Sequence, residues 1–418
     1  MSEYTMNRRE FLTASTAATA GLWLAGQPLF AQNTESSGSA GPTVAIGVIG
    51  LGLQGREIVN TIGRLEGAEV KAICDIYEPY IRRVADAAPG AKSYTEYQKI
   101  LEDENIPAVI VATPTHQHKQ IVFDAIAAGK HVYCESPIAH TTEDAKAIAQ
   151  AGLGSSKVFQ VGLQFRADPL HKHVLTFMRT GVPGRLALLK SQWNRKFSMR
   201  RMAPTPDRER ELNWKLYNSN CSGILGEVAL PQIDMMSWYV GALPESVRAD
   251  GGVMFWTDGR ETADTVQATF LYPGGLQYNC ATTLVNSFGG SHETVYGSEA
   301  AIYFKGPKSW MFKEADSAML GWEVYAKKEP IGDDTGITLV ADATKIIQAG
   351  REPSKEDVDY AKDPLYYSLE EFATNVREGA SPSAGATEGL AAAVTAIKAH
   401  EALTSGNEVK YQKEWFEV

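Results

Sequence analysis

The sequence lacks an excess of basic residues and contains few cysteines. Its 40 Lys and Arg residues are outnumbered by 50 Asp and Glu residues, a formal net charge of -10, and no basic run is interleaved with aromatic residues. A nucleic-acid partner is therefore not expected, because such partners are bound through clustered positive charge. The four cysteines lie far apart without the spacing of metal ligands, so no metal site is predicted. No internal repeat is visible.

The cysteines leave one bonding question open. Cys74 and Cys134 fall within apolar strand patterns and are predicted to be small buried residues. Cys221 and Cys280 could form a disulfide in an oxidising compartment, and the sequence does not decide whether they do.

No apolar run is long enough to be expected to span a membrane. The N-terminal apolar stretch ends at Phe30 and is interrupted by glycine and proline, whereas a span needs about 20 strongly apolar residues. It follows Arg8 and Arg9 in the stretch NRREFL, which resembles a twin-arginine (Tat) export signal. We therefore expect a signal peptide over residues 1–31, a polar linker over 32–43, the Tat machinery as a partner, and a periplasmic or other extracytoplasmic location.

A glycine-rich turn follows the first apolar strand after the linker. Residues 44–49 are apolar, Gly50, Gly52 and Gly55 follow as GxGxxG, and an amphipathic helix pattern begins at once. This order is typical of dinucleotide binding, because the glycines permit a tight turn, close approach of the pyrophosphate and close packing of helix on strand. The phosphates are expected at the N-terminus of the helix.

Asp75 ends the next predicted strand, at about the spacing of a ribose-binding acid. A carboxylate there accepts hydrogen bonds from the ribose hydroxyls and repels a 2'-phosphate, which favours NAD over NADP. Arg82 and Arg83 follow in the next helix and could serve a phosphate instead, so NADP stays the alternative.

Strands and helices then alternate, as in a doubly wound parallel sheet. Residues 108–112 and 131–134 are apolar strands with an amphipathic helix between them. Ligands bind such sheets outside the carboxyl ends of the strands. The residues predicted to bind the cofactor are Gly50, Leu51, Gly52, Leu53, Gln54, Gly55, Asp75, Ile76, Ala112, Thr113, Pro114, His116, His118, Glu135, Ser136, Pro137 and Gln164.

From residue 158 the pattern changes to strands with few helices between them. Strands are predicted over 158–164, 186–194, 246–255, 265–272 and 276–284, and helices over 228–241 and 388–403. Runs of strands predict an α+β domain with a large, mostly antiparallel open sheet. The last helix is expected to pack back on the nucleotide domain. The expected domains are an α/β Rossmann domain over 44–157, an α+β domain over 158–385, and a C-terminal helix and tail over 386–418.

These motifs together resemble the glucose-fructose oxidoreductase, inositol dehydrogenase and MocA (Gfo/Idh/MocA) family. The matching stretches, in the family's order, are VIGLGLQG, CD, ATPTHQH, VYCESP, QVGLQFR and GILGEVALPQIDMMSWYVG. The resemblance implies a Rossmann domain that holds a nicotinamide cofactor, often tightly. It also implies a sheet domain that supplies a carbohydrate site and a surface for homo-oligomers. Exported members with a Tat signal occur in this family.

The chain departs from the family at two positions that carry chemistry. Ser136 stands where family members have the lysine of a Glu-Lys-Pro motif. Pro231 replaces the histidine of an Asp-x-Gly-x-His-x-x-Asp signature, in which Glu227 replaces the first acid and Asp234 retains the last. A positioned base contributes about 10²- to 10⁴-fold to removal of a hydroxyl proton, and a lysine stabilises the developing alkoxide. Ordinary family chemistry is therefore expected to be impaired or rerouted.

Three residues are candidates to replace the missing catalytic groups. Asp234 could accept a proton or orient its neighbours, and His116 could act as an acid or base or contact the cofactor. Lys190 could bring positive charge to a substrate hydroxyl. Residues expected to contact a carbohydrate are Arg166, Asn194, Gln232 and Asp234.

The strand that contains Lys190 poses a choice between two faces. Side chains alternate along a strand, so Lys190 and Asn194 share one face while Trp193 and Arg195 share the other. Only one pair can point at the site. The polar run 195–214 that follows is expected to be a long loop near the mouth of the site.

Three functional hypotheses fit these observations. The first is an exported NAD(P)-dependent oxidoreductase that acts on a sugar, polyol or glycoside with a replaced acid/base set. The second is a cofactor- or carbohydrate-binding relative that has lost turnover. The third is a redox-neutral enzyme whose tightly held NAD transiently oxidises a glycoside so that it can be cleaved. The retained nucleotide motif favours the readings in which the cofactor is bound.

Overall fold

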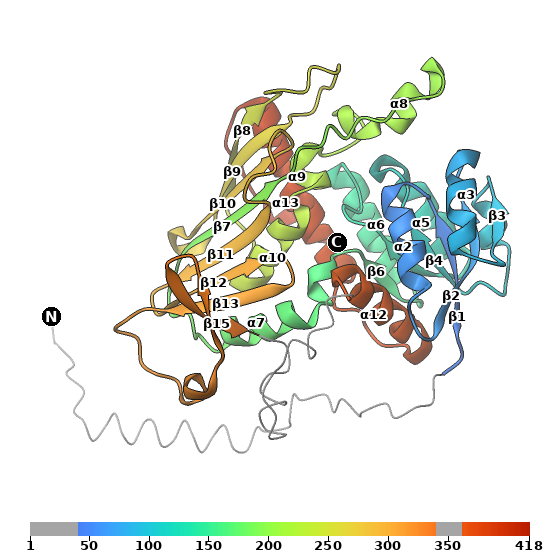
Figure 1. Ribbon diagram of the computed structural model, residues 1–418. Helices are drawn as coiled ribbons and strands as arrows, with labels where there is room; N and C mark the ends of the chain where they lie inside the picture. Colours follow the sequence, from blue (N-terminus) through green and yellow to red (C-terminus); the bar gives the residue numbers. More distant parts are fainter. Residues whose placement is uncertain (1–40, 340–361) are drawn as a thin grey trace. The chain divides into compact units, whose positions relative to one another are not determined.

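The computed structural model describes residues 41–339 and 362–418; the expected signal peptide and most of the linker lie outside them. Six parallel strands form one sheet in the order β3-β2-β1-β4-β5-β6 (Figure 1). The strands are β1 Val44–Ile49, β2 Ala68–Cys74, β3 Lys92–Tyr94, β4 Ala108–Val111, β5 His131–Cys134 and β6 Phe159–Val161. The helices between them are α2 Leu53–Ile62, α3 Glu78–Val84, α4 Gln98–Leu101, α5 His118–Ala127 and α6 Thr142–Gly154. This is the expected Rossmann arrangement.

The central strand β4 shows why its sequence is continuously apolar. All four of its residues are fully buried, because helices cover both faces of the sheet. Ala108 and Ile110 join the core under α2 and α3, whereas Val109 and Val111 join the core under α5 and α6. A strand with one solvent-facing side would alternate apolar and polar residues instead.

The first domain extends further than the sequence predicted. Residues 158–164 were expected to open the second domain, but β6 pairs in parallel with β5 and completes the first sheet. The strand has only three residues, so its apolar pattern alone does not reveal which sheet it joins.

A ten-stranded sheet forms the second domain, in the order β14-β15-β13-β12-β11-β7-β10-β9-β8-β16. Neighbouring strands run antiparallel except β7 and β10, which are parallel. The sheet is therefore mostly antiparallel, as predicted. Its strands are β7 Leu186–Asn194, β8 Ser246–Gly252, β9 Thr265–Leu271, β10 Gln277–Thr283, β11 Ser291–Gly297, β12 Ala300–Lys305, β13 Lys308–Lys313, β14 Lys328–Ile331, β15 Asp334–Leu339 and β16 Val409–Lys410.

Helix α10, Leu230–Val240, begins where Pro231 requires it to begin. Pro231 lies in the first turn, where its missing N–H has no intrahelical acceptor, and Gly241 ends the helix in the left-handed conformation. The other helices of this half are α7 Pro169–Arg179, α8 Glu209–Leu212 and α9 Gly223–Glu227.

Two C-terminal helices pack on the first domain, and one of them also contacts the second. Helix α13, Ala386–Ser405, packs against α6 of the first domain and β8 of the second (Figure 1). Helix α12, Pro364–Glu378, lies within the range expected for the second domain but packs on α2 and β1 of the first. Both helices therefore contribute apolar residues to the cores beneath the Rossmann sheet.

The four cysteines are buried free thiols, so Cys221 and Cys280 do not form the disulfide that the sequence left open. Within the described residues, no helix has the length and apolar character needed to cross a membrane.

Candidate active site

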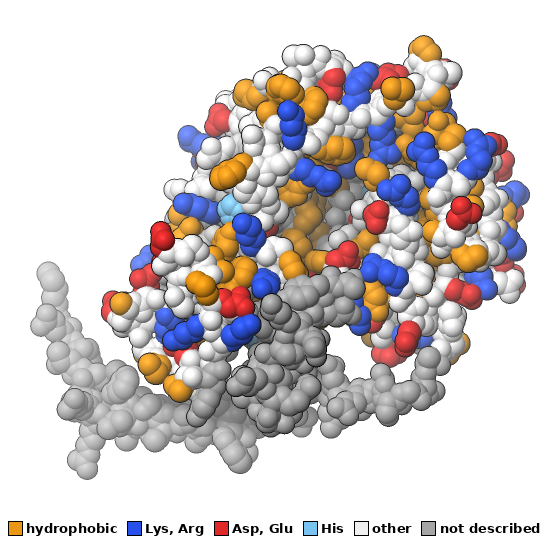
Figure 2. All heavy atoms as spheres, in the orientation of Figure 1, with side chains coloured by type: hydrophobic (Ala, Val, Ile, Leu, Met, Phe, Trp, Pro, Cys, Tyr) orange, Lys and Arg blue, Asp and Glu red, His pale blue; other side chains and the backbone are white. Residues whose placement is uncertain are grey.

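A cleft of about 810 Å³ lies outside the carboxyl ends of β1, β4 and β5. Residues of both domains line it, and Figure 2 shows this face of the molecule hollowed between the domains. Of the predicted cofactor residues, those that line the cleft are Gly50, Gly52, Leu53, Gln54, Asp75, Ile76, Ala112, Thr113, Pro114, His118, Glu135, Ser136 and Gln164. The two sequence segments expected to meet the nicotinamide therefore come together here.

The glycine turn has the geometry that dinucleotide binding requires. Gly50 has a φ of +93°, and a Cβ there would lie 2.6 Å from the backbone of Ala112. A Cβ on Gly55 would lie 1.9 Å from the carbonyl oxygen of Gly50, so only glycine permits this helix to approach the turn. A Cβ on Gly52 would meet no atom within 4 Å, because this position faces the open cleft. The turn thus fits a pyrophosphate at the start of α2.

Asp75 lies at the end of β2, facing the same cleft. One carboxylate oxygen accepts a hydrogen bond from the backbone N–H of Leu51 at 2.7 Å, and the other accepts one from Tyr77 at 2.8 Å. Burial raises the pKa of Asp75, and these bonds and the charges of Arg208 and Arg201 oppose that rise. The acid is therefore fixed beside the glycine turn, where a ribose would lie.

The loop after β7 reaches the Asp75 end of the cleft. Arg201 donates a hydrogen bond to the hydroxyl of Tyr80 at 2.6 Å, and the guanidinium of Arg208 lies 5.0 Å from the ring centroid of Tyr77. Both arginines line the cleft together with tyrosines of the first domain. A segment of the second domain thus closes over the site expected for the adenosine half of a dinucleotide.

Ser136 lies in the cleft, but its hydroxyl is already engaged. It donates to the carbonyl oxygen of Gly162 at 3.0 Å. The neighbouring Glu135 is buried, and it accepts hydrogen bonds from the side chain of Gln54 at 2.9 Å and from the backbone N–H of Ser136 at 3.2 Å. Burial raises the pKa of Glu135 to about 7, against the opposing effect of these bonds and of Lys215. Glu135 can therefore gain or lose a proton near neutral pH.

Lys215 and Glu227 face this cleft from the second domain. The ammonium of Lys215 lies 3.2 Å from a carboxylate oxygen of Glu227, and the other oxygen accepts a hydrogen bond from Thr115 at 3.0 Å. The sequence signals only Glu227, through its place in the altered family signature. The sequence does not signal Lys215, because it lies in a single 3-10 turn, Trp214–Leu216, where no spacing indicates the direction of a side chain.

Two candidates on β7 lie outside this cleft. Trp193 and Arg195 line it, so the opposite face of the strand carries Lys190 and Asn194. The ammonium of Lys190 is exposed and lies 5.4 Å from the ring centroid of Tyr296, and Asn194 donates to a neighbouring loop carbonyl. The expected roles of Lys190 in catalysis and of Asn194 in substrate contact do not fit these positions.

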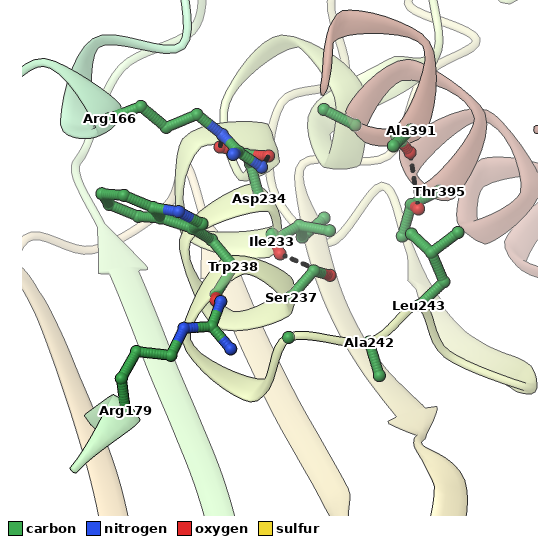
Figure 3. Close-up of a pocket in the computed structure, with 12 residues that line it drawn as sticks. Arg166, Arg179, Ile233, Asp234, Ser237, Trp238, Ala242, Leu243, Ala391 and Thr395 are labelled. Carbon is green, nitrogen blue, oxygen red and sulfur yellow. Dashed lines mark hydrogen bonds and ion pairs between the residues drawn. The ribbon is translucent and has the colours of Figure 1, made fainter. Parts of the chain in front are cut away.

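Asp234 and Arg166 line a separate pocket of about 380 Å³ (Figure 3). Two hydrogen bonds of 2.8 Å join the guanidinium to the carboxylate, and Arg166 also lies over the ring of Trp238. Burial raises the pKa of Asp234, and the charge of Arg166 opposes that rise. Gln232 is buried and bonds to Glu293 and to β7. These three predicted residues thus bond to other residues of the fold and do not line the cleft.

The two histidines that follow β4 differ in their surroundings. His118 is buried with its ring nitrogens 2.9 Å and 3.3 Å from the carbonyl oxygens of Thr113 and Ile138, and burial lowers its pKa to about 4. It therefore stays neutral and braces the loop. His116 lies edge-on to Trp214 behind the cleft lining, and burial lowers its pKa too. Its Nδ1 is buried without a hydrogen-bond partner among the described residues.

Two family models match the chain. An oxidoreductase family model with an NAD-binding Rossmann fold matches residues 44–163, and a GFO/IDH/MocA C-terminal domain model matches residues 172–303. The chain belongs to the Gfo/Idh/MocA family. Its first domain is an NAD-binding Rossmann domain, in agreement with the glycine turn and Asp75.

The relatives and solved structures to which the chain is similar cover different shares of it. A myo-inositol 2-dehydrogenase of Thermotoga maritima is 23% identical over 368 residues, which are 88% of this chain and 98% of that protein. An alpha-N-acetylgalactosaminidase of Shewanella oneidensis is 31% identical over 207 residues, 44% of this chain and 45% of that protein. A levoglucosan dehydrogenase structure with NADH and levoglucosan superposes with a TM-score of 0.72 at 21% identity, covering 88% of this chain and 99% of that one.

Proposed function

We propose that this protein is an exported NAD-dependent oxidoreductase that acts on a sugar, polyol or glycoside. The observation that carries the proposal is the cleft itself, in which a dinucleotide turn meets the ionisable groups Glu135, Lys215 and Glu227. The names of the relatives support a carbohydrate substrate, because they include inositol and levoglucosan dehydrogenases.

Different residues of the cleft have different roles in the proposed reaction. Bound NAD supplies a hydride acceptor, so that a secondary alcohol can become a carbonyl. The glycine turn would hold the pyrophosphate and Asp75 would accept hydrogen bonds from the ribose hydroxyls. Glu135, with a pKa of about 7, accepts the hydroxyl proton of the substrate. In this proposal Glu135 is the proton acceptor, although the lysine and histidine of other family members are absent.

The cofactor is proposed to be NAD, held tightly. Asp75 opposes a 2'-phosphate, while Arg201 and Arg208 are the groups that could favour NADP. The closure of the arginine loop over Tyr77 and Tyr80 supports slow release of the cofactor.

Location and assembly complete the proposal. Arg8 and Arg9 support export by the Tat route, and the family resemblance supports a homo-oligomer formed through the second sheet. Replacement of both arginines by lysine should leave the protein in the cytoplasmic fraction. Light scattering of the purified protein should give a mass above 45.5 kDa, that of the single chain.

The decisive experiment on function begins with the cofactor. The purified protein is denatured, and released NAD(H) and NADP(H) are separated and quantified. Released NAD(H), followed by nicotinamide reduction with one member of a sugar and polyol panel, supports the proposal. A protein that releases no nicotinamide cofactor and binds none when it is added would contradict it.

A redox-neutral glycoside cleavage is the second candidate function. It is favoured by the similarity to the alpha-N-acetylgalactosaminidase, together with the absence of the usual lysine and histidine. Bound NAD without net reduction, together with sugar released from a glycoside, would select this function. Bound NAD with neither reaction would select a cofactor-holding relative that has lost turnover.

A further inference from the structure

We propose that Lys215 binds the reacting oxygen of the substrate and supplies the positive charge that Ser136 cannot supply. This inference rests on the proposed function, because it assigns a role within the same cleft. It places the family's missing ammonium on a different domain, in the 3-10 turn Trp214–Leu216, outside the family's motifs.

The position of Lys215 is the first support. It lies in the cleft lining with Glu135 and Ser136, and its charge acts on Glu135. Its side chain is 38% exposed, so the ammonium can be reached by a ligand in the cleft. Lys215 thus lines the same cleft as the group proposed to take the proton, and its charge acts on that group.

The fixed orientation of Lys215 is the second support. Its ammonium lies 3.2 Å from Glu227 and 5.1 Å from the ring centroid of Trp214. Glu227 is only 4% exposed and is held by Thr115, so this anchor spans the two domains. The backbone carbonyl of Lys215 accepts a hydrogen bond from Thr262 at 3.1 Å. An ammonium has three N–H donors, so engagement by Glu227 leaves donors for a substrate oxygen.

The other cations of the cleft have different surroundings. Among the described residues that line it, the remaining cationic side chains are Arg195, Arg201 and Arg208. Arg201 and Arg208 act at Asp75, and Arg195 lies over the ring of Phe197 in an exposed loop. Lys215 is therefore the cation in this set that acts on Glu135.

The chemical consequence follows from the charges. As the hydroxyl proton passes to Glu135, negative charge grows on the substrate oxygen, and an ammonium within hydrogen-bond reach stabilises it. Lys215 keeps its own protons throughout. The hydroxyl of Ser136 carries no charge and is bonded to Gly162, so it cannot do this.

Binding to the reduced holoprotein tests the inference without turnover. The protein is loaded with NADH and titrated with levoglucosan, myo-inositol and the methyl glycoside of N-acetylgalactosamine, none of which has a free aldehyde or ketone group, while tryptophan and NADH fluorescence are followed. No hydride can move in such a complex, because both partners are already reduced. Lys215→Met should weaken the tightest of these ligands by about 10- to 100-fold, the range for one charged hydrogen bond. Lys215→Arg should weaken it less.

Matched variants separate this role from a loss of structure. Lys172 forms a comparable pair with Glu371, at 3.4 Å and with 45% exposure, outside the cleft lining. Lys172→Met should leave binding unchanged. Because Lys215→Met leaves Glu227 buried without its cation, the double variant with Glu227→Gln removes both charges and should show the same weakened binding. Ser136→Lys placed in Lys215→Met should restore part of the affinity.

The outcomes distinguish the inference from the proposed function. If the wild-type protein binds NADH and a ligand of the panel, and Lys215→Met and the double variant bind that ligand equally well, the role of Lys215 is overturned alone. If the wild-type protein binds none of the panel, the carbohydrate function is overturned, and the role of Lys215 falls with it.

Discussion

Glu135 is the residue whose protonation most directly couples structure to chemistry in this cleft. Glu135 follows directly after the short strand β5, and its side chain is buried. Two hydrogen bonds to its carboxylate do not outweigh the cost of burying the charge, so its pKa rises to about 7.

Glu135→Gln should lower the rate of substrate oxidation by about 10²- to 10⁴-fold, because an amide cannot accept the proton. In the wild-type protein the rate should rise with pH through about 7, since only the ionised carboxylate is a base. Initial rates of nicotinamide reduction measured across pH check both statements. Glu293→Gln is the control, because Glu293 is also buried with a pKa of about 7 but lies outside the cleft lining. An unchanged pH profile in Glu135→Gln would contradict the assignment.

The same two glutamates predict how stability depends on pH. Burial raises the pKa of each from 4.5 to about 7, so the folded state holds its proton more tightly than the unfolded state. The stabilisation is fully present below pH 4.5 and is lost as pH rises through about 7. Each group accounts for about 3 kcal/mol at most. Urea unfolding across this range should show stability falling with rising pH, and each Gln variant should flatten part of that slope.

At the scale of elements, two glycines of the same turn are expected to affect different properties: Gly55 the stability of the fold and Gly52 the binding of NAD. Gly55→Ala should destabilise the protein by about 1–3 kcal/mol or more, because its Cβ would collide with the carbonyl of Gly50. Gly52→Ala should leave thermal stability of the cofactor-free protein unchanged, since its Cβ meets no atom, yet weaken NAD binding by filling the space of the phosphate. Thermal melts with and without NAD compare the two. Equal NAD affinity in Gly52→Ala and the wild-type protein would place the pyrophosphate elsewhere.

The loop after β7 is expected to slow cofactor release. The double variant Arg201→Ala and Arg208→Ala removes its contacts with Tyr80 and Tyr77 and should speed NADH dissociation by about 10-fold, the effect of one net hydrogen bond. Stopped-flow displacement of NADH by excess NAD measures this rate. Arg248→Ala provides the control, because Arg248 forms an exposed ion pair with Glu408. A faster release in the control as well would point to a general loosening.

Elements were more predictable from the sequence than the faces that they present. The bounds of β7 match the predicted 186–194, because a stretch that begins with four apolar residues gives way to a polar loop. Alternation divides its side chains into two sets but does not say which set meets the other domain. Lys190 and Lys215 illustrate the limit, since the position of each ammonium depends on tertiary contacts with Tyr296 and Glu227.

At the scale of the whole molecule, helix α13 makes the two domains depend on each other. Residues of α13 belong to the large core that also contains α6 and the second sheet. We therefore expect Pro42–Val418 to unfold in one cooperative transition by calorimetry. Ala396→Asp, which buries a charge in α13, should lower the melting temperature of that one transition without splitting it. Two resolved transitions in the wild-type protein would show that α13 does not couple the domains.

The hydrogen bond between Gln54 and Glu135 has a thermodynamic consequence for cofactor uptake. Gln54 belongs to the turn that receives the pyrophosphate, and its amide donates to the carboxylate that holds or releases a proton. Binding linkage is reciprocal: if NAD binding changes the proton affinity of Glu135, then protonation of Glu135 changes the affinity for NAD by the same factor. Titration calorimetry of NAD in buffers of different ionisation enthalpy should therefore report a net uptake or release of protons on binding. The affinity of the cofactor-free protein for NAD should accordingly differ between an acidic and a neutral compartment.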